Sequence, residues 1–378
     1  MTQRQLCNKF HINSKAKQLN FMIAQKMLGI CHLVAAVFMI LTAWYGATAE
    51  GGVDFATIFS LYSLSVAFYM PTIALSNSVA YTALRQAGMD TVKDFPPIRV
   101  FGTVGFILTM WFVDIMGFQT NHWQFVTSAV IGIVLFLYSF TLPQCPVAKG
   151  DEHRSLSEAF GLQAFTLFRQ KQMALFFIFS MLLGISLQIT NGYANPFISS
   201  FASEPEFADT FGVQHANILI SLSQISETLC ILLIPFCMKR FGIKNVMLIS
   251  MLAWVLRFGL FSVGDPGSGV WMFILSMIVY GVAFDFFNVS GSLFVDQNTA
   301  PEIRSSAQGL FMLMTNGIGG TIGVIAAQQI INAYTHGMKI GDQFYTVGEW
   351  STCWFIFSAY ALVVGLVFAL VFHPQKLK

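Results

Sequence analysis

A single acidic residue, Asp285, lies in the middle of an apolar stretch that runs from Trp271 to Phe294. A carboxylate at the centre of a bilayer costs about 2.5–3.5 kcal/mol on insertion scales, so acids at that depth usually face a protein interior or a water-filled cavity. An apolar environment disfavours the charged form of an acid, so such a group can load and release a proton near neutral pH. Asp285 is therefore a candidate proton carrier. A structural ion pair with Arg257, on the preceding apolar stretch, is the alternative, and the residue alone leaves both open.

Other polar side chains occur within apolar stretches at helical spacing. Gln188 and Asn191 are three residues apart, as are Gln224 and Glu227, so each pair shares one face of a helix. Further candidates on two other stretches are Arg99, Thr103, Phe106, Tyr280 and Phe284. Amides and carboxylates can hydrogen-bond the edges of a polar, ring-containing solute, and aromatic side chains can stack on its face. Interhelical hydrogen bonding would explain one such pair, but several pairs on separate stretches favour a binding cavity.

Motifs for other chemistries are missing from the sequence. It contains no nucleophile elbow, HExxH or P-loop, so neither hydrolysis nor ATP coupling is supported and we do not expect an enzyme. The six cysteines are scattered without a CxxC pair, which argues against a zinc site. The glycines between Gly317 and Gly323 half-resemble a dinucleotide loop, but in an apolar stretch close helix packing explains them better. We expect no metal and no cofactor.

The elements that must position the candidate residues are membrane-spanning helices. Of the 378 residues, 55% are hydrophobic and only 10% are charged, whereas a soluble protein has roughly 25% charged residues. The net charge of +2 is too small to indicate a nucleic-acid partner. With about 20 apolar residues per span, we predict an all-α polytopic protein of the lipid bilayer. Its ten expected spans lie near 27–47, 55–84, 99–118, 123–143, 173–201, 216–238, 246–264, 270–294, 306–333 and 351–373.

The basic residues test this number of spans. With residue 1 in the cytoplasm, ten spans place nearly all Lys and Arg residues in cytoplasmic segments. Arg99 and Arg257 lie at or within spans, and Lys339 is the exception among the others. This is the positive-inside bias, which adding or removing one span would scramble. We therefore expect both termini in the cytoplasm.

The longest polar connection, residues 144–172, divides the spans into four and six, whereas many transporters have two six-helix halves. Within it, Ser155-Leu-Ser-Glu158 has the pattern of a capping box. The amphipathic stretch that follows predicts a short helix on the inner membrane surface, with apolar residues Leu156, Phe160, Phe165 and Phe168. The expected domains are a cytoplasmic N-terminal segment (1–26), an incomplete N-terminal transmembrane bundle (27–143), the cytoplasmic linker (144–172) and a C-terminal six-helix bundle (173–378).

Several segments closely resemble the bacterial nucleoside:proton symporters, a branch of the major facilitator superfamily. They are Ala87–Asp90 with Asp94–Phe106, Leu187–Asn191, Ser223–Thr228 and Phe284–Gly291. The resemblance extends from about residue 27 to the C-terminus, with the motifs in the family's order and spacing. It implies helix bundles of the major-facilitator type around a central cavity. It also implies proton-driven nucleoside import across the bacterial inner membrane by alternating access.

The resemblance further implies a role for individual residues. The family's binding positions fall on Arg99, Thr103, Phe106, Gln188, Asn191, Gln224, Glu227, Tyr280, Phe284 and Asp285. The amides and Glu227 would bind ribose hydroxyls and base edges, and the aromatic residues would stack on the base. Asp285 and Arg99, together with Glu227, look like the proton-coupling groups. The expected partners are a nucleoside and a proton, and we expect a monomer.

The chain departs from the family pattern at its beginning. The family has twelve spans, and the first two have no counterpart here, since residues 1–26 are hydrophilic. The superfamily's gating-loop motif is visible only as its second-half echo, Lys239–Lys244. A truncated or non-transporting membrane protein that binds a nucleoside or a partner therefore stays open. A sugar:proton symporter also stays open, because amides and acids bind hydroxyl groups in general.

Overall fold

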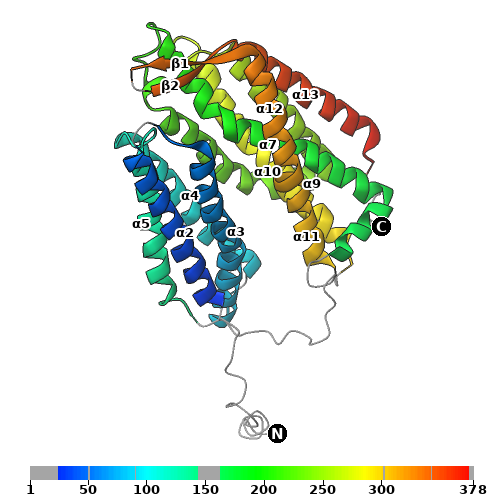
Figure 1. Ribbon diagram of the computed structural model, residues 1–378. Helices are drawn as coiled ribbons and strands as arrows, with labels where there is room; N and C mark the ends of the chain where they lie inside the picture. Colours follow the sequence, from blue (N-terminus) through cyan, green and yellow to red (C-terminus); the bar gives the residue numbers. More distant parts are fainter. Residues whose placement is uncertain are drawn as a thin grey trace, which may run out of the picture. The chain divides into compact units, whose positions relative to one another are not determined.

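The computed structural model describes residues 24–49, 52–89, 91–143, 162–300, 303–341 and 343–373. The chain forms two units, and helices dominate both of them (Figure 1). The first unit comprises Met1–Phe101 and Gly117–Asp151, and the second comprises Gly102–Met116 and Glu152–Lys378. Helix α4 (Thr91–Ile115) is thus divided, and its later part belongs to the second unit.

The first unit contains, besides the beginning of α4, helices α2 (Ala24–Thr48), α3 (Phe55–Gln86) and α5 (Trp123–Ser139). Helix α2 packs against both α3 and α5. The contact with α5 is close, because a Cβ atom on Gly132 would lie 3.0 Å from that of Ala36. Small residues allow two helices to approach this closely. Close packing matters in lipid, because the hydrophobic effect does not drive helices together there. The buried Ser65 hydroxyl donates to the Ala35 carbonyl at 2.9 Å, which joins α3 to α2.

The second unit is a larger helical bundle with one short hairpin. Its elements, besides the later part of α4, are η1 (Leu162–Arg169), α7 (Lys171–Ser200), η2 (Phe201–Ser203), α8 (Phe211–Gln214), α9 (Ala216–Val263), α10 (Val270–Gln297), α11 (Arg304–Met312), the π-helical η3 (Leu313–Gly319), α12 (Gly320–Tyr334), β1 (Thr335–Ile340), β2 (Gln343–Gly348) and α13 (Trp350–Val371).

The helical, membrane-spanning character predicted from the sequence is confirmed. Among the described residues, eight helical segments are long and apolar enough to cross a membrane. Two shorter apolar helices, Val100–Ile115 and Trp123–Ser139, occupy the positions of the third and fourth predicted spans. Two predicted spans merge in the continuous α9, but Gly242 interrupts it with a φ of 77° and a ψ of 163°. Glycine tolerates a positive φ without the steric penalty of a side chain, so the chain can turn between the two spans there.

The hairpin between α12 and α13 was not expected from the sequence. Strands β1 and β2 pair antiparallel, from Thr335 opposite Gly348 to Ile340 opposite Gln343. Gly341 begins the turn with a φ of 61°. The hairpin lies at one end of the second unit, and the end of α13 lies at the other (Figure 1).

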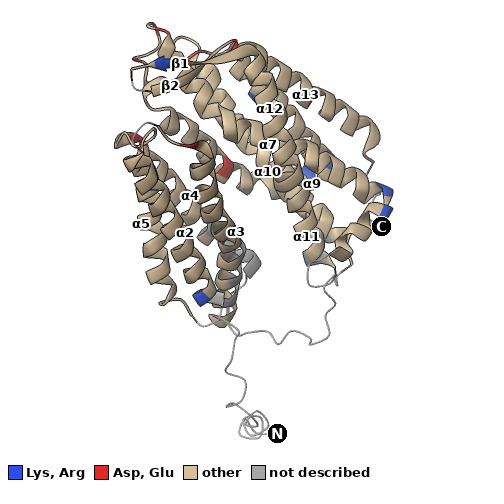
Figure 2. Ribbon diagram, in the orientation of Figure 1, with Lys and Arg blue, Asp and Glu red and all other residues tan. Residues whose placement is uncertain are grey.

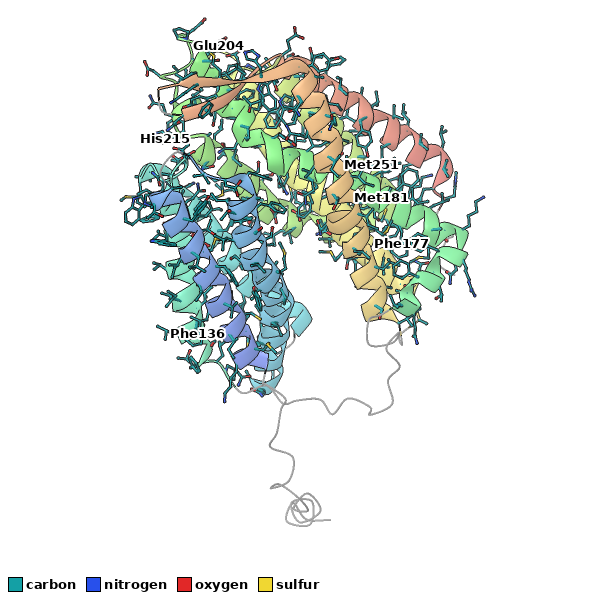
Figure 3. The ribbon with its side chains drawn as sticks, in the orientation of Figure 1. Phe136, Phe177, Met181, Glu204, His215 and Met251 are labelled. Atoms are coloured by element: carbon teal, nitrogen blue, oxygen red, sulfur yellow. The ribbon has the colours of Figure 1, made fainter. Side chains whose placement is uncertain are left out.

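The core of the second unit is rich in aromatic side chains. Phe177 on α7 and Met251 on α9 are fully buried or nearly so (Figure 3). The Trp354 ring of α13 contacts one ring from each of two other helices. Its centroid lies 5.4 Å from that of Phe197 on α7 and 5.7 Å from that of Phe258 on α9. Aromatic pairs in these arrangements contribute about 0.5–1.5 kcal/mol beyond their buried area.

Helix α7 approaches η3 and α12 closely through glycines, as the sequence predicts for the run that begins at Gly317. A Cβ atom on Gly319 would lie 2.3 Å from the Met181 carbonyl oxygen, and one on Gly323 would lie 2.9 Å from the Ile185 Cα atom. A larger residue at either position would therefore force the helices apart. These glycines serve packing between helices.

Charged residues separate along the second unit. Most Lys and Arg residues lie toward the end that carries the C-terminus, and acidic residues lie at the end that carries β1 and β2 (Figure 2). In the sequence, Glu204, Asp209 and Asp265 fall between helices at the hairpin end, whereas Lys239 and Arg240 fall at the opposite turn. Such a separation is typical of a bundle that crosses a membrane.

The predicted linker is described only in part. Residues 144–161, which hold the capping box with Leu156 and Phe160, lie outside the described residues, as do residues 1–23. Phe165 and Phe168 lie on η1, a 3₁₀-helix. Phe168 packs against Phe177 of α7, with ring centroids 5.4 Å apart, so η1 is attached to the helical core.

Candidate functional site

A cavity of about 360 Å³ opens inside the second unit, at the lower end of the roughly 300–1,000 Å³ typical of small-molecule sites. Its wall comes from α4, α7, α9 and α10. Four residues that the sequence singled out line it: Phe106, Asn191, Gln224 and Tyr280. Residues far apart in the sequence thus meet around one space, as a binding cavity requires.

The polar part of the wall consists of amides from α7 and α9. Within the described part of the chain, the Asn191 and Gln224 side chains form no hydrogen bond to another residue. Their donors and acceptors are therefore available to a ligand. Asn195 and Asn217 also line the cavity, and the Asn195 Nδ2 atom donates to the Asn217 Oδ1 atom at 2.7 Å. Our sequence reasoning missed both, although Asn195 follows Asn191 by one helical turn.

The aromatic part of the wall comes from α4 and α10. Phe106 is 53% exposed, whereas Tyr280 is buried except where it meets the cavity. The Tyr280 ring stacks on Phe284, with centroids 5.9 Å apart and planes inclined by 18°, and it meets Trp254 edge-on at 6.0 Å. Phe284 itself lines a separate small cavity of about 30 Å³ together with Asn288. The two aromatic residues predicted to share a face of α10 therefore do so.

The two acidic candidates lie beside the cavity wall. Glu227 is half-buried one turn beyond Gln224 on α9, and Asp285 on α10 is only 2% exposed. Asp285 directly follows Phe284, whose ring stacks on Tyr280. Neither acidic candidate is among the residues that line the 360 Å³ space. The two carboxylates are thus on helices that form the cavity wall, but they are not part of its lining.

Arg257 of α9 is a further cavity residue, which the sequence suggested only as an ion-pair partner of Asp285. It is 1% exposed and lines the same wall as Tyr280. Its guanidinium donates from Nη1 to the Ser276 carbonyl at 2.6 Å and from Nε to Thr190 Oγ1 at 3.3 Å. These contacts are to neutral groups, so neither of them is the ion pair with Asp285 that the sequence left open.

Of the other predicted site residues, Thr103 and Gln188 are not among those that line this cavity. Thr103 is half-buried on α4. Gln188 packs beside Gly320 of α12, where a Cβ atom on the glycine would lie 3.1 Å from the Gln188 Cγ atom. Arg99 lies on α4, and its side chain is outside the described part of the structure.

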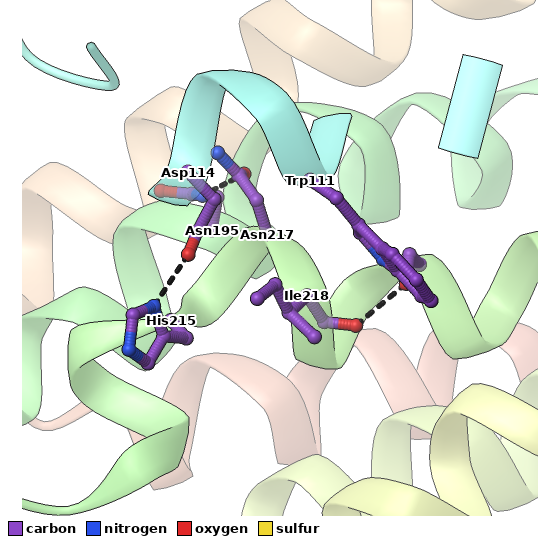
Figure 4. A network of polar contacts seen from close by, with 7 residues as sticks. Trp111, Asp114, Asn195, His215, Asn217 and Ile218 are labelled. Carbon is purple, nitrogen blue, oxygen red and sulfur yellow. Dashed lines mark hydrogen bonds and ion pairs between the residues drawn. The ribbon is translucent and has the colours of Figure 1, made fainter. Parts of the chain in front are cut away.

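The α4 segment that carries Phe106 is fastened to α9 by polar contacts (Figure 4). The Trp111 Nε1 atom donates to Ser221 Oγ at 2.8 Å. The Asp114 carboxylate, whose side chain is fully buried, lies 2.6 Å from the His215 Nδ1 atom. These contacts hold the later part of α4, which carries Phe106, against the beginning of α9.

Comparison with known proteins places the chain in one family. The model of the family described as "Nucleoside H+ symporter" matches residues 10–377. The chain is 46% identical to the nucleoside permease NupG of Escherichia coli over 356 residues, which cover 94% of this chain and 82% of that protein. It is also 46% identical to the xanthosine permease of the same organism over 361 residues, with the same coverage.

Solved structures agree with this assignment. The crystal structure of the nucleoside transporter NupG superposes with a TM-score of 0.80 at 45% identity, covering 94% of this chain and 84% of that one. At only 14% identity, the structure of the xylose transporter XylE from E. coli matches 93% of this chain and 81% of that one with a TM-score of 0.51, which indicates the fold alone. The fold is of the major-facilitator type, and the chain is a member of the nucleoside H+ symporter family.

Proposed function

We propose that this chain imports nucleosides together with protons across the bacterial inner membrane by alternating access, with the 360 Å³ cavity as its nucleoside site. The observation that carries the proposal is the composition of the cavity wall in a member of the symporter family. Available amides lie on one part of the wall and aromatic rings lie on another. A nucleoside requires both, because it has a polar edge and a flat ring.

Nucleoside recognition divides between these two parts of the wall. The Asn191 and Gln224 amides bind ribose hydroxyls and base edges, with Gln188 and Thr103 as further polar groups. Phe106 and Tyr280 stack on the base, and Phe284 supports the Tyr280 ring from behind at 5.9 Å. The same amides would bind a sugar, but a sugar has no flat ring to occupy the aromatic part.

Proton coupling is assigned to Asp285, assisted by Arg99 and Glu227. Burial of Asp285 in the membrane-spanning α10 supports this role, because acids at such depth are typical of proton and substrate pathways. Protonation from outside and release inside would allow the loaded carrier to reorient. Asp285 directly follows Phe284, whose ring stacks on Tyr280, so the proposed proton carrier and the aromatic part of the wall lie on the same turn of α10.

The membrane arrangement follows from charge. We place both termini in the cytoplasm, because Lys and Arg gather at the C-terminal end of the second unit. The proposed domains are the cytoplasmic segment 1–26, the transmembrane bundle 27–143, the cytoplasmic linker 144–172 and the six-helix bundle 173–378. A single copy embedded in the lipid bilayer contains the whole cavity described, which supports a monomer.

Uptake of labelled uridine into proteoliposomes tests the proposal. An imposed gradient, acidic outside, is expected to drive accumulation that a protonophore abolishes. Flux that ignores the gradient would refute proton coupling. Binding of uridine without flux would favour the non-transporting alternative, and competition by sugars but not by other nucleosides would favour a sugar symporter.

A further inference from the structure

Arg257 is a buried cation that the proposed transport mechanism does not use. It lies within α9, is 1% exposed and forms part of the cavity wall. A charge at such a position is costly unless surrounding dipoles and rings stabilise it. Its contacts therefore indicate what it does.

Those contacts join three helices through neutral groups. From α9, the guanidinium donates to the Thr190 hydroxyl on α7 and to the Ser276 carbonyl on α10. The Ser276 hydroxyl donates back to the Arg257 carbonyl at 3.1 Å. Thr190 directly precedes Asn191, and Ser276 lies about one turn before Tyr280. One side chain thus holds both helices beside their ligand-facing residues.

The guanidinium also contacts the Tyr280 ring itself. Its Cζ atom lies 4.6 Å from the centroid of Tyr280 and 5.0 Å from that of Phe261. A cation over an aromatic face is attracted by the ring quadrupole, and more strongly when both groups are desolvated. Tyr280 is thereby held by Arg257, by the edge of Trp254 and by the stacked Phe284 ring.

We infer that Arg257 is a positioning residue for nucleoside binding, which acts by holding the Tyr280 ring in place at the cavity. This inference rests on the proposed nucleoside site. Preorganising an aromatic wall raises affinity because the ring loses no further freedom when the base stacks on it. Arg257 need not touch the nucleoside to have this effect.

A double-mutant cycle on uridine binding tests the inference. Arg257→Met is expected to weaken uridine binding to the purified protein about tenfold. In a Tyr280→Leu background the same change should have at most about a twofold effect, since the ring it positions is gone. Arg257→Lys should recover part of the affinity, because it keeps the cation but loses the two simultaneous hydrogen bonds. Lys171→Met, at an exposed basic residue that begins α7, is the matched control and should bind uridine as the wild type does.

The outcomes distinguish failure of the proposed nucleoside site from failure of the role inferred for Arg257. Failure of the wild type to bind uridine would remove the proposed nucleoside site and this inference with it. Binding by the wild type with equal losses from Arg257→Met in both backgrounds would overturn the inference alone, as would no loss at all. If Arg257→Met does not fold, Thr190→Val removes one hydrogen-bond acceptor of the guanidinium. It should then show a smaller loss with the same dependence on Tyr280.

Discussion

Two regions of the second unit bury charge in different ways. At the junction of α4 and α9, the Asp114 carboxylate meets an ionisable partner, His215, at 2.6 Å. At the cavity, Arg257 is surrounded by a hydroxyl, a carbonyl and aromatic rings, while the buried Asp285 lies on another helix. A charge paired locally fastens two helices. A charge surrounded by neutral groups and rings instead joins the helices that form the cavity wall.

The largest expected effect is on gradient-driven uridine accumulation, and it should differ between the two buried acids, Asp285 and Asp114. Asp285→Asn removes the titratable group at the cavity, so gradient-driven uridine accumulation should fall by more than about tenfold while uridine exchange continues. Asp114→Asn is the matched control, because it neutralises a buried acid at the junction and should leave the gradient dependence intact. Uptake with and without a pH gradient measures both. Unchanged accumulation by Asp285→Asn, or loss of coupling in Asp114→Asn, would show that the two buried acids do not have these different roles.

The next effect concerns the available amides of the cavity. Gln224→Leu removes hydrogen bonds to the nucleoside without changing a charge, and binding should weaken about tenfold. Asn245→Ala, an exposed amide on the same helix, should leave the affinity unchanged. Calorimetric titration with uridine distinguishes them. Equal affinities of Gln224→Leu and wild type would show that the nucleoside does not use this part of the wall.

At the junction, the expected effect is on stability. Asp114→Asn and His215→Gln each disrupt the 2.6 Å contact and should each lower the free energy of unfolding by about 1–3 kcal/mol. The double variant should lose less than the sum of the two, because both single changes remove the same interaction. Thermal unfolding in detergent without nucleoside gives the three values. Strictly additive losses would show that the two residues act separately.

The smallest effect lies outside the membrane-spanning segments, at the beginning of α3. The Asp54 carboxylate accepts hydrogen bonds from the Thr57 hydroxyl at 2.7 Å and the Thr57 amide at 2.8 Å. These bonds lower the pKa of Asp54 below its ordinary value of 3.8. A lowered acid pKa stabilises the fold above the unfolded-state value, and this contribution disappears as the pH falls through the folded-state value. Asp54→Ala should therefore slightly lower the melting temperature at neutral pH, with a difference that shrinks below about pH 3.8. A difference independent of pH would contradict this cause, and Asp54→Asn, which retains a capping side chain, serves as the control.

Much of the fold could be predicted because a bilayer constrains a chain strongly. Apolar runs such as Trp350–Val371 must be helices in lipid, since only internal hydrogen bonds can satisfy their backbone. The hairpin Thr335–Gly348 lies in a connection between spans, where no such constraint acts. The sequence did not indicate the π-helical segment Leu313–Gly319 either, and it lies where η3 packs closely against Gly184 of α7.

The candidate site was predictable at the level of single helices. Helical spacing indicated that Gln224 shares a face with Glu227, and that Tyr280 shares one with Phe284. It could not show that Asn217 meets Asn195, because nothing in a local pattern tells which helices face each other.

From its sequence alone, the chain is determined to be a helical membrane protein with polar groups on particular faces, because lipid excludes unpaired polar groups from its interior. The motifs in the sequence also indicated the family resemblance. Tertiary structure decided which of those faces enclose the cavity and what surrounds Arg257. A guanidinium can be satisfied by a carboxylate or by carbonyls and rings, and only the packing of α7, α9 and α10 selects between them.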